Sequence, residues 1–317
     1  MGRVLLVVFL LAAILAHGQS RTQVLFLNDD LSNVHSRMQF NISALLTDFN
    51  TSFVAQRAPN FDGGVIVTDE ARERVRQLWA SGAFRCPETN LSGNILRRPS
   101  GGYQFRNIPL IIAGQEGGQE AVVNLDSEGR IEDVNFGIEQ HKYAALLSKG
   151  NTLTDLNRRK MIVDFLENFR TAYNRKDIEL LRQAFSDNAL IIVGRVLEPQ
   201  PNHPEYMMSL GKKRVELIQY NKQQYLAQLL KSFERNAFID VKFEEVEITK
   251  HPGFANIYGV NVKQSWRSST YGDVGYLFLM IDFENEQHPL IHVRSWQPEK
   301  ETAREEVIEL GDFDIIK

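Results

Sequence analysis

Past about residue 150, the hydrophobic positions of the chain follow a helical period. From Asp155 onward, apolar residues recur at steps of three and four, which predicts an amphipathic helix; they are Met161, Ile162, Phe165, Phe169, Ala172 and Tyr173. A short helix is expected after Asp177 and another over 221–235, with a β-rich run at 189–197 between them. The prolines that follow residue 198 indicate a loop.

From residue 238 onward, the period of the pattern changes to two. Alternating apolar and polar residues predict four long strands, over 238–249, 255–268, 274–285 and 290–297. The joins between them are short and contain Gly or Pro, which indicates antiparallel hairpins. Helices followed by antiparallel strands define an α+β domain with its helices gathered on one face of the sheet.

Three stretches of this region resemble the NTF2-like superfamily, to which the SnoaL-type cyclases and ketosteroid isomerase belong. They are FLENFRTAYN at 165–174, the hairpin sequence YGDVGYLFL at 271–279 and the closing strand IHVRSWQP at 291–298. The last two resemble exported two-domain NTF2-like proteins of gut Bacteroidetes. The resemblance implies a cone, in which a curved antiparallel sheet packs on helices and encloses a pocket.

The first half of the chain repeats part of this order. LLTDFNTSF at 45–53 aligns with 165–173 and places Phe49 over Phe169. A helix and several strand-like runs are expected after it, namely a helix over 68–79, strands over 83–89, 93–99 and 103–113, and a hairpin over 121–136. This half is therefore predicted to be a second, mostly antiparallel α+β unit. It is either a diverged second NTF2-like copy or an unrelated small domain of the same class.

The start of the chain predicts export. Arg3 precedes an uninterrupted apolar run over 4–16, which is shorter than the roughly 20 residues of a bilayer span. Ala16 and Gly18 supply small residues at positions −3 and −1 of a cut before Gln19. We therefore expect a signal peptide at 1–18, a secreted or periplasmic protein, and no membrane span after the signal is removed.

Length and polarity together indicate two domains after the signal. A chain of 317 residues exceeds the size at which a single core usually stops growing. A polar, Gly-containing stretch near residue 150 has the composition of a linker. The predicted division is an N-terminal α+β domain at 19–147, a linker at 148–154 and an NTF2-like domain at 155–317.

Charge and cysteine content exclude some partners and some chemistry. Lys and Arg number 36 against 40 for Asp and Glu, a net charge of −4, and nucleic acid is not an expected partner because phosphate binding needs a basic face. Cys86 is the single cysteine, so the chain has no disulfide within itself. Its apolar neighbours favour a small buried side chain over a nucleophile.

The resemblance implies that any catalytic groups lie inside the cone. Enzymes of the superfamily place a tyrosine of the first helix there, together with Asp or His side chains, and the matching candidates are Tyr173, Asp282 and His292. A buried aspartate would have a raised pKa and could exchange a proton near neutral pH. The alternatives are a solvent-facing strand end for Asp282 and a hydrogen-bonded structural role for His292. A full acid–base set is missing, so we assign no catalytic residue.

Metal and cofactor motifs do not emerge from the sequence. His288 and His292 would lie roughly 13 Å apart along a strand, too far apart to share one zinc ion. A Gly-rich phosphate loop, a nucleophile elbow and a zinc-protease motif are all absent from the sequence. We therefore expect neither a metal nor a cofactor.

A set of aromatic residues near the expected pocket points to a ligand. Rings on one strand face can stack on a flat apolar molecule, with a polar side chain as anchor. The expected ligand-binding residues are Tyr173, Tyr258, Gln264, Trp266, Tyr276, Phe278, His292, Arg294 and Trp296. The alternative is that these rings only fill the core.

These arguments favour an exported, non-catalytic binding or interaction protein whose NTF2-like domain holds a small apolar or aromatic ligand. The alternative is a cofactor-free isomerase, cyclase or dehydratase that uses Tyr173, Asp282 and His292. The opposite face of the sheet is the expected contact for a second copy of the chain, as a homodimer, or for an envelope protein.

Overall fold

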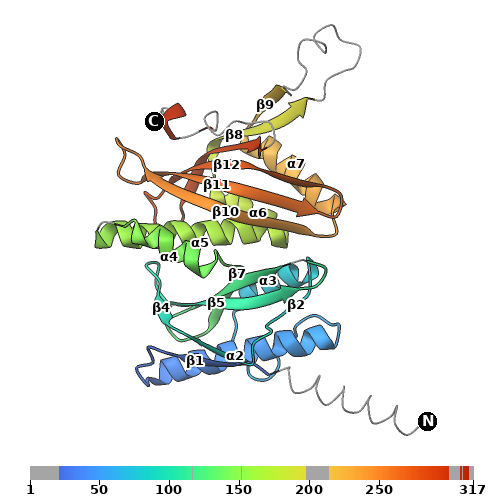
Figure 1. The fold of residues 1–317 in the computed structure, drawn as a ribbon, viewed down its shortest axis with the longest axis vertical. Coiled ribbons are helices and arrows are strands. Elements are labelled where there is room, and N and C mark those ends of the chain that lie inside the picture. The colour runs from blue at the N-terminus through green and yellow to red at the C-terminus, as the bar shows by residue number, and fades with distance from the viewer. Residues whose placement is uncertain are drawn as a thin grey trace, which may run out of the picture. The chain divides into compact units, whose positions relative to one another are not determined.

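The computed structural model describes residues 21–115, 117–150, 152–197, 214–299, 308 and 310–313. The predicted signal peptide and the proline-containing loop after residue 198 lie outside the described residues. The chain divides into two compact units, Met1–Ala145 and Leu146–Lys317 (Figure 1).

The first unit packs two helices against a small sheet. Helix α2 (Asn33–Val54) is capped by the hydroxyl of Ser32, and α3 (Asp69–Ala80) is capped by that of Thr68. Both helices bury an apolar face, and Phe49 lies edge-on to Phe84 with ring centroids 5.0 Å apart. The helix predicted over 68–79 is confirmed to within one residue at each end.

The strands of the first unit form a mostly antiparallel arrangement. Strand order in the sheet is β2-β5-β6-β7, β4 pairs with β5, and β1 and β3 form a separate parallel pair. Their bounds, with the following helix, are β1 (Gln23–Phe26), β2 (Phe84–Arg85), β3 (Asn90–Gly93), β4 (Ile95–Arg97), β5 (Tyr103–Ile112), β6 (Gly118–Leu125), β7 (Ile131–Phe136) and α4 (Gln140–Ser148). The α+β class predicted for this half of the chain is confirmed.

The helices of the second unit begin and end at identifiable caps. Helix α5 (Leu153–Arg175) starts after Thr152, whose hydroxyl accepts a hydrogen bond from a backbone N–H of the first turn. It ends where Lys176 adopts a left-handed conformation, with φ 59°. Helix α6 (Ile178–Ala184) follows directly, and α7 (Lys222–Arg235) comes after the first two strands. The start of α5 lies two residues before the Asp155 expected from the pattern.

One six-stranded sheet curls across α5 in the order β10-β11-β12-β13-β8-β9 (Figure 1). The bounds are β8 (Phe185–Leu197), β9 (Arg214–Tyr220), β10 (Ile239–Lys250), β11 (Ile257–Ser268), β12 (Gly272–Asp282) and β13 (Leu290–Pro298). The last four strands are antiparallel, as predicted. Strand β8 adds a parallel pairing with β13, and it begins at Phe185 rather than at residue 189 because α6 ends at Ala184.

The two faces of this sheet have different neighbours. The inner face, toward α5, carries alternate residues of β11 from Tyr258 to Trp266. The outer face carries a small apolar cluster that includes Leu310, a residue near the C-terminus that belongs to a short 3₁₀ turn, η4 (Leu310–Asp312). Gly259 leaves space there, since a Cβ at this position would lie 3.0 Å from that of Leu310. The chain itself therefore covers part of the face that we expected a second copy to contact.

No helix among the described residues combines the length and the apolar character needed to cross a membrane.

Candidate functional site

Tyr173 lies in the last turn of α5, enclosed between the helices and the inner face of the sheet. It is 2% exposed. Its ring meets Phe169 edge-on at 5.2 Å and Trp266 edge-on at 5.8 Å between centroids. Three- and four-residue spacing along α5 produces this row of rings. The predicted first-helix tyrosine is thus inside the cone and in contact with a predicted strand residue.

The hydroxyl of Tyr173 is paired with that of Tyr225 on α7, at 2.8 Å. A reciprocal capping box between Asn221 and Gln224 fixes the start of α7 at Lys222, which places Tyr225 in the first turns of the helix. The ring of Tyr225 also lies edge-on to Phe185 at 5.6 Å. The sequence predicts a helix over 221–235 but gives Tyr225 within it no polar role, so this role was missed.

Arg294 on β13 completes a polar cluster within the cone. The residue is 6% exposed, and its guanidinium carbon lies 5.0 Å from the centroid of the Tyr225 ring, a cation–π contact. In the described part of the chain, Nε and Nη1 of Arg294 are buried without a hydrogen-bond partner. A buried charge with unsatisfied donors is costly unless something compensates it.

Tyr173 does not supply that compensation as an anion. Burial raises the pKa of Tyr173 well above its usual value, and the neighbouring Tyr225 raises it further. Burial acts to lower the pKa of Arg294, but Tyr225 and Tyr173 outweigh it and the pKa is raised. At neutral pH the guanidinium cation of Arg294 therefore lies beside a neutral Tyr173 hydroxyl. Within the described residues, no carboxylate forms an ion pair with Arg294.

The same sheet face carries further polar groups near this cluster. Trp296 lies two residues from Arg294 on β13, is half-buried, and its Nε1 is buried with no partner among the described residues. Its indole packs over Gly275, where a Cβ would lie 2.8 Å from the ring. Gln264 of β11 is opposite Gly275 in the strand register and is also buried. Five of the predicted ligand residues thus lie in or beside this cluster on the inner side of the sheet: Tyr173, Gln264, Trp266, Arg294 and Trp296.

Three other predicted ligand residues are not part of this cluster. Tyr258 shares the face of Trp266, but it lies at the other end of β11 against Phe283, with ring centroids 6.0 Å apart. Tyr276 and Phe278 point to the outer face, where Phe278 stacks on Phe313 at 5.6 Å. Alternate residues of a strand face opposite sides of a sheet. Leu277 and Leu279 therefore take the inner positions of β12.

Asp282 and His292 form a pair of their own, with 3.5 Å between Oδ2 and Nε2. Both line a groove of about 810 Å³ on the outer side of the sheet, and Tyr173 is not among its lining residues. The register between β12 and β13 shifts between Ile291 and Val293, so His292 is the extra residue of a β-bulge. The structure does not bring the three candidate catalytic residues into one site.

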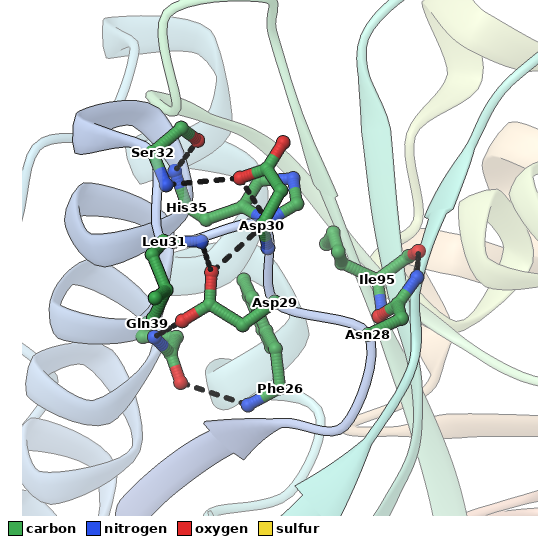
Figure 2. A network of polar contacts seen from close by, with 9 residues as sticks. All are labelled: Phe26, Asn28, Asp29, Asp30, Leu31, Ser32, His35, Gln39 and Ile95. Carbon is green, nitrogen blue, oxygen red and sulfur yellow. Dashed lines mark hydrogen bonds and ion pairs between the residues drawn. The ribbon is translucent and has the colours of Figure 1, made fainter.

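The first unit contains a separate polar network where the chain enters α2 (Figure 2). Nδ1 of His35 lies 3.2 Å from Oδ1 of Asp29 and 3.0 Å from Oδ1 of Asp30. These three atoms are within 4.8 Å of one another, a spacing that could hold a metal ion. Each carboxylate also accepts protein hydrogen bonds, Asp29 from Leu31 N–H and Gln39 Nε2, and Asp30 from Ser32 N–H. These hydrogen bonds explain the network as a structural one that holds the loop before α2 against the first turns of that helix.

No protein-family model matches the sequence, and no curated protein sequence matches it. Solved structures resemble parts of the chain. A provisionally assigned dehydratase of the NTF2-like family from Streptomyces avermitilis is 11% identical over 44% of this chain and 93% of its own, with a TM-score of 0.32. Bd1075 of Bdellovibrio bacteriovorus is 13% identical over 67% of this chain and 82% of its own, with a TM-score of 0.34.

An NTF2-like protein from Cytophaga hutchinsonii is 16% identical over 45% of this chain and 98% of its own, with a TM-score of 0.34. These matches say nothing about activity. The topology of the second unit has the arrangement that the sequence predicts, with one addition: strand β9 (Arg214–Tyr220), which pairs with β8, was not predicted. Two helices, a strand pair, a third helix and four antiparallel strands follow one another along the chain, and the sheet curls across the first helix. The second unit is an α+β cone with a curled sheet, the arrangement that the resemblance of its sequence to the NTF2-like superfamily implies.

Proposed function

We propose that this protein is an exported, non-catalytic binding protein whose NTF2-like cone holds a small ligand with an aromatic or apolar body and an anionic group. Export rests on the signal-like pattern at 1–18. Ligand binding rests on one observation: Arg294 is buried, and its Nε and Nη1 lack partners in the described residues.

The anionic group is assigned because the unsatisfied atoms of Arg294 and Trp296, on the inner face of β13, are all donors. Nε and Nη1 of Arg294 and Nε1 of Trp296 all carry hydrogen and are buried without partners in the described chain. A carboxylate is acceptor-only when ionised and forms charge-assisted bonds with a guanidinium, which are stronger than bonds between neutral groups. A bound anion would therefore accept hydrogen bonds from these donors and also neutralise the charge of the guanidinium.

The aromatic or apolar body is assigned from the rings around the cluster. Trp266 and Trp296 are half-buried, whereas Tyr173 behind them is fully enclosed. An indole combines a large apolar surface with one donor, a combination suited to stacking on a flat molecule. We assign the two tryptophans to the side from which a ligand enters, and Arg294 to the interior end.

The alternative, an isomerase, cyclase or dehydratase, has less support. Its proton-transfer groups would be Asp282 and His292, but these line the outer groove rather than the cone that contains Tyr173. A general base must come within hydrogen-bond reach of the proton it removes. The polar groups near Tyr173 are donors or neutral hydroxyls, which suit binding better than proton abstraction.

Calorimetric titration of the mature chain, starting at Gln19, tests this proposal. We expect 3-phenylpropanoate to bind and 3-phenylpropan-1-ol to bind at least tenfold more weakly, because the alcohol lacks the charge. Arg294→Gln should remove this preference. Arg267→Gln is the matched control, since Arg267 pairs with Asp240 at 3.5 Å and lies on the other face of β11. Equal affinity for acid and alcohol, or no binding of either, would refute the assignment.

A further inference from the structure

The outer groove of the second unit is a different site from the cone. It encloses about 810 Å³ and is lined by the first residues of β8, the turn before β11, the end of β12 and the bulge of β13. Its floor is apolar and consists of Leu190, Ile257, Met280 and Val293. A concave surface with an apolar floor and a few converging polar groups is the usual form of a small-molecule site.

The polar groups of this groove are mainly acidic. Its lining contains Asp187, Asp282 and Glu284, and none of the described lining residues is Lys or Arg. Lys222 neutralises Asp187, with 2.9 Å between Nζ and Oδ1, and that aspartate side chain is almost fully exposed. Among the described lining residues, His292 is then the one basic side chain, and it lies 3.5 Å from Asp282.

Asp282 is held in place by the fold. One carboxylate oxygen, Oδ1, accepts the backbone N–H of Glu284 at 2.7 Å. The other, Oδ2, faces His292 Nε2 at 3.5 Å, longer than a normal hydrogen bond. The side chain of Asp282 is 21% exposed, so it is partly desolvated yet still reachable. Oδ2 thus has acceptor capacity that the described chain does not fully use.

Ser186 adds a second unused polar atom. The residue lines the groove and is 7% exposed, and its Oγ is buried without a hydrogen-bond partner in the described residues. Phe185 pairs with Ile291 in the parallel register of β8 and β13. The next residue on each strand is Ser186 and His292, so both turn to the outer face. The hydroxyl and the His–Asp pair therefore belong to the same end of the groove.

We propose that this groove binds a small organic ammonium ion with an aromatic or aliphatic body. The ammonium group would donate to Asp282 Oδ2 and Ser186 Oγ, and Glu284 would add attraction without contact at longer range. The body would lie on the apolar floor. Phe254 and Phe313 also line the groove and offer ring faces, which attract cations. Charge complementarity selects a cation here, whereas the donors around Arg294 select an anion in the cone.

Titration of the mature chain with 2-phenylethylammonium chloride, followed by calorimetry, tests this inference. We expect saturable binding, and at least tenfold weaker binding of the neutral analogue 2-phenylethanol. Asp282→Asn keeps an acceptor oxygen for Glu284 N–H but removes the charge, and it should weaken ammonium binding about tenfold. Glu286→Gln is the charge-matched control, because Glu286 pairs with Arg158 at 2.8 Å and does not line the groove.

A second variant separates loss of the site from loss of the fold. Ala255 is an exposed lining residue, so Ala255→Trp should fill the groove and abolish binding without changing the thermal unfolding midpoint. Arg294→Gln should leave ammonium binding unchanged, which distinguishes this site from the cone. Equal binding of the alcohol, full affinity in Asp282→Asn, or full affinity in Ala255→Trp would each overturn the inference.

Discussion

The hydroxyl of Tyr173 on α5 lies 2.8 Å from the hydroxyl of Tyr225 on α7, and both residues are buried. Helix α6 and strands β8 and β9 separate the two helices in the chain, so this bond joins distant parts of the cone. Because burial raises the pKa of Tyr173, its hydroxyl stays neutral and supplies a dipole rather than a charge beside Arg294. The guanidinium is consequently the single strong charge of this cluster, which is why we assign an anion to it.

Tyr225→Phe should destabilise the second unit by about 1–2 kcal/mol, because it leaves the buried hydroxyl of Tyr173 without this partner. Chemical denaturation measures the change. The double variant with Tyr173→Phe should cost less than the sum of the two single variants, since removal of both hydroxyls leaves no orphan. Strict additivity would show that the two hydroxyls do not interact.

Arg294→Met should stabilise the unliganded protein by about 1–3 kcal/mol, because it replaces a buried charge that lacks an ionic partner with an apolar side chain of similar length. The same change should abolish binding of 3-phenylpropanoate. Urea unfolding and calorimetry on one preparation measure both effects. A less stable variant would mean that the guanidinium is already compensated within the protein.

Gly275→Ala should destabilise the sheet and displace Trp296. A Cβ at Gly275 would lie 2.3 Å from the carbonyl oxygen of Gln297 and 2.8 Å from the indole of Trp296, and a backbone atom cannot move aside easily. We expect a loss of about 1–3 kcal/mol, with a change in tryptophan fluorescence. Gly272→Ala is the control, because a Cβ there would meet its nearest atom at an ordinary 3.6 Å. Equal stability of the two variants would contradict the predicted clash.

We expect the first unit to lose stability in acid when the carboxylate of Asp126 becomes protonated. Burial acts to raise the pKa of Asp126, but bonds from Arg130 and Glu128 outweigh it and the pKa is lowered. A lowered native pKa means that the stabilisation is present above the unfolded value of about 3.9 and is lost as the pH falls through the native value.

Asp126→Asn should therefore reduce stability by about 0.5–1 kcal/mol at pH 7, a modest effect because the ion pair is partly exposed to solvent. The difference from the unmodified protein should shrink as the pH falls below about 3.9. Thermal unfolding across this pH range measures it, with Glu128→Gln as the exposed control. A difference that does not change with pH would exclude ionisation as the cause.

Periodicity predicted most of the second unit because its helices and strands are long. Arg294 and Trp296 were both expected to bind the ligand, and alternation along β13 does place them on one face. His292 was expected with them, but the β-bulge at His292 turns it to the other face together with Asp282. A bulge adds one residue without a clear sequence signal, so the separation of the cone from the outer groove was not predictable.

Tyr225 shows a different limit of sequence analysis. Its spacing from Leu229 and Phe233 is helical, and a tyrosine in such a stripe has the pattern of a core residue. Only the approach of α7 to α5 gives its hydroxyl a partner, and that approach depends on contacts between segments far apart in the sequence. The fold class followed from local patterns, whereas the composition of the polar cluster did not.

The small residue at Gly259 has a consequence for self-association. It allows Leu310 to pack against β11, while Phe313 stacks on Phe278. The end of the described chain therefore covers surface of the sheet that a second molecule would have to contact. Any dimer built through this surface must first compete with a segment tethered to it, whose effective local concentration is high. A high protein concentration alone would therefore favour dimerisation only weakly. Dissociation of this segment from the sheet would be the step that controls dimer formation.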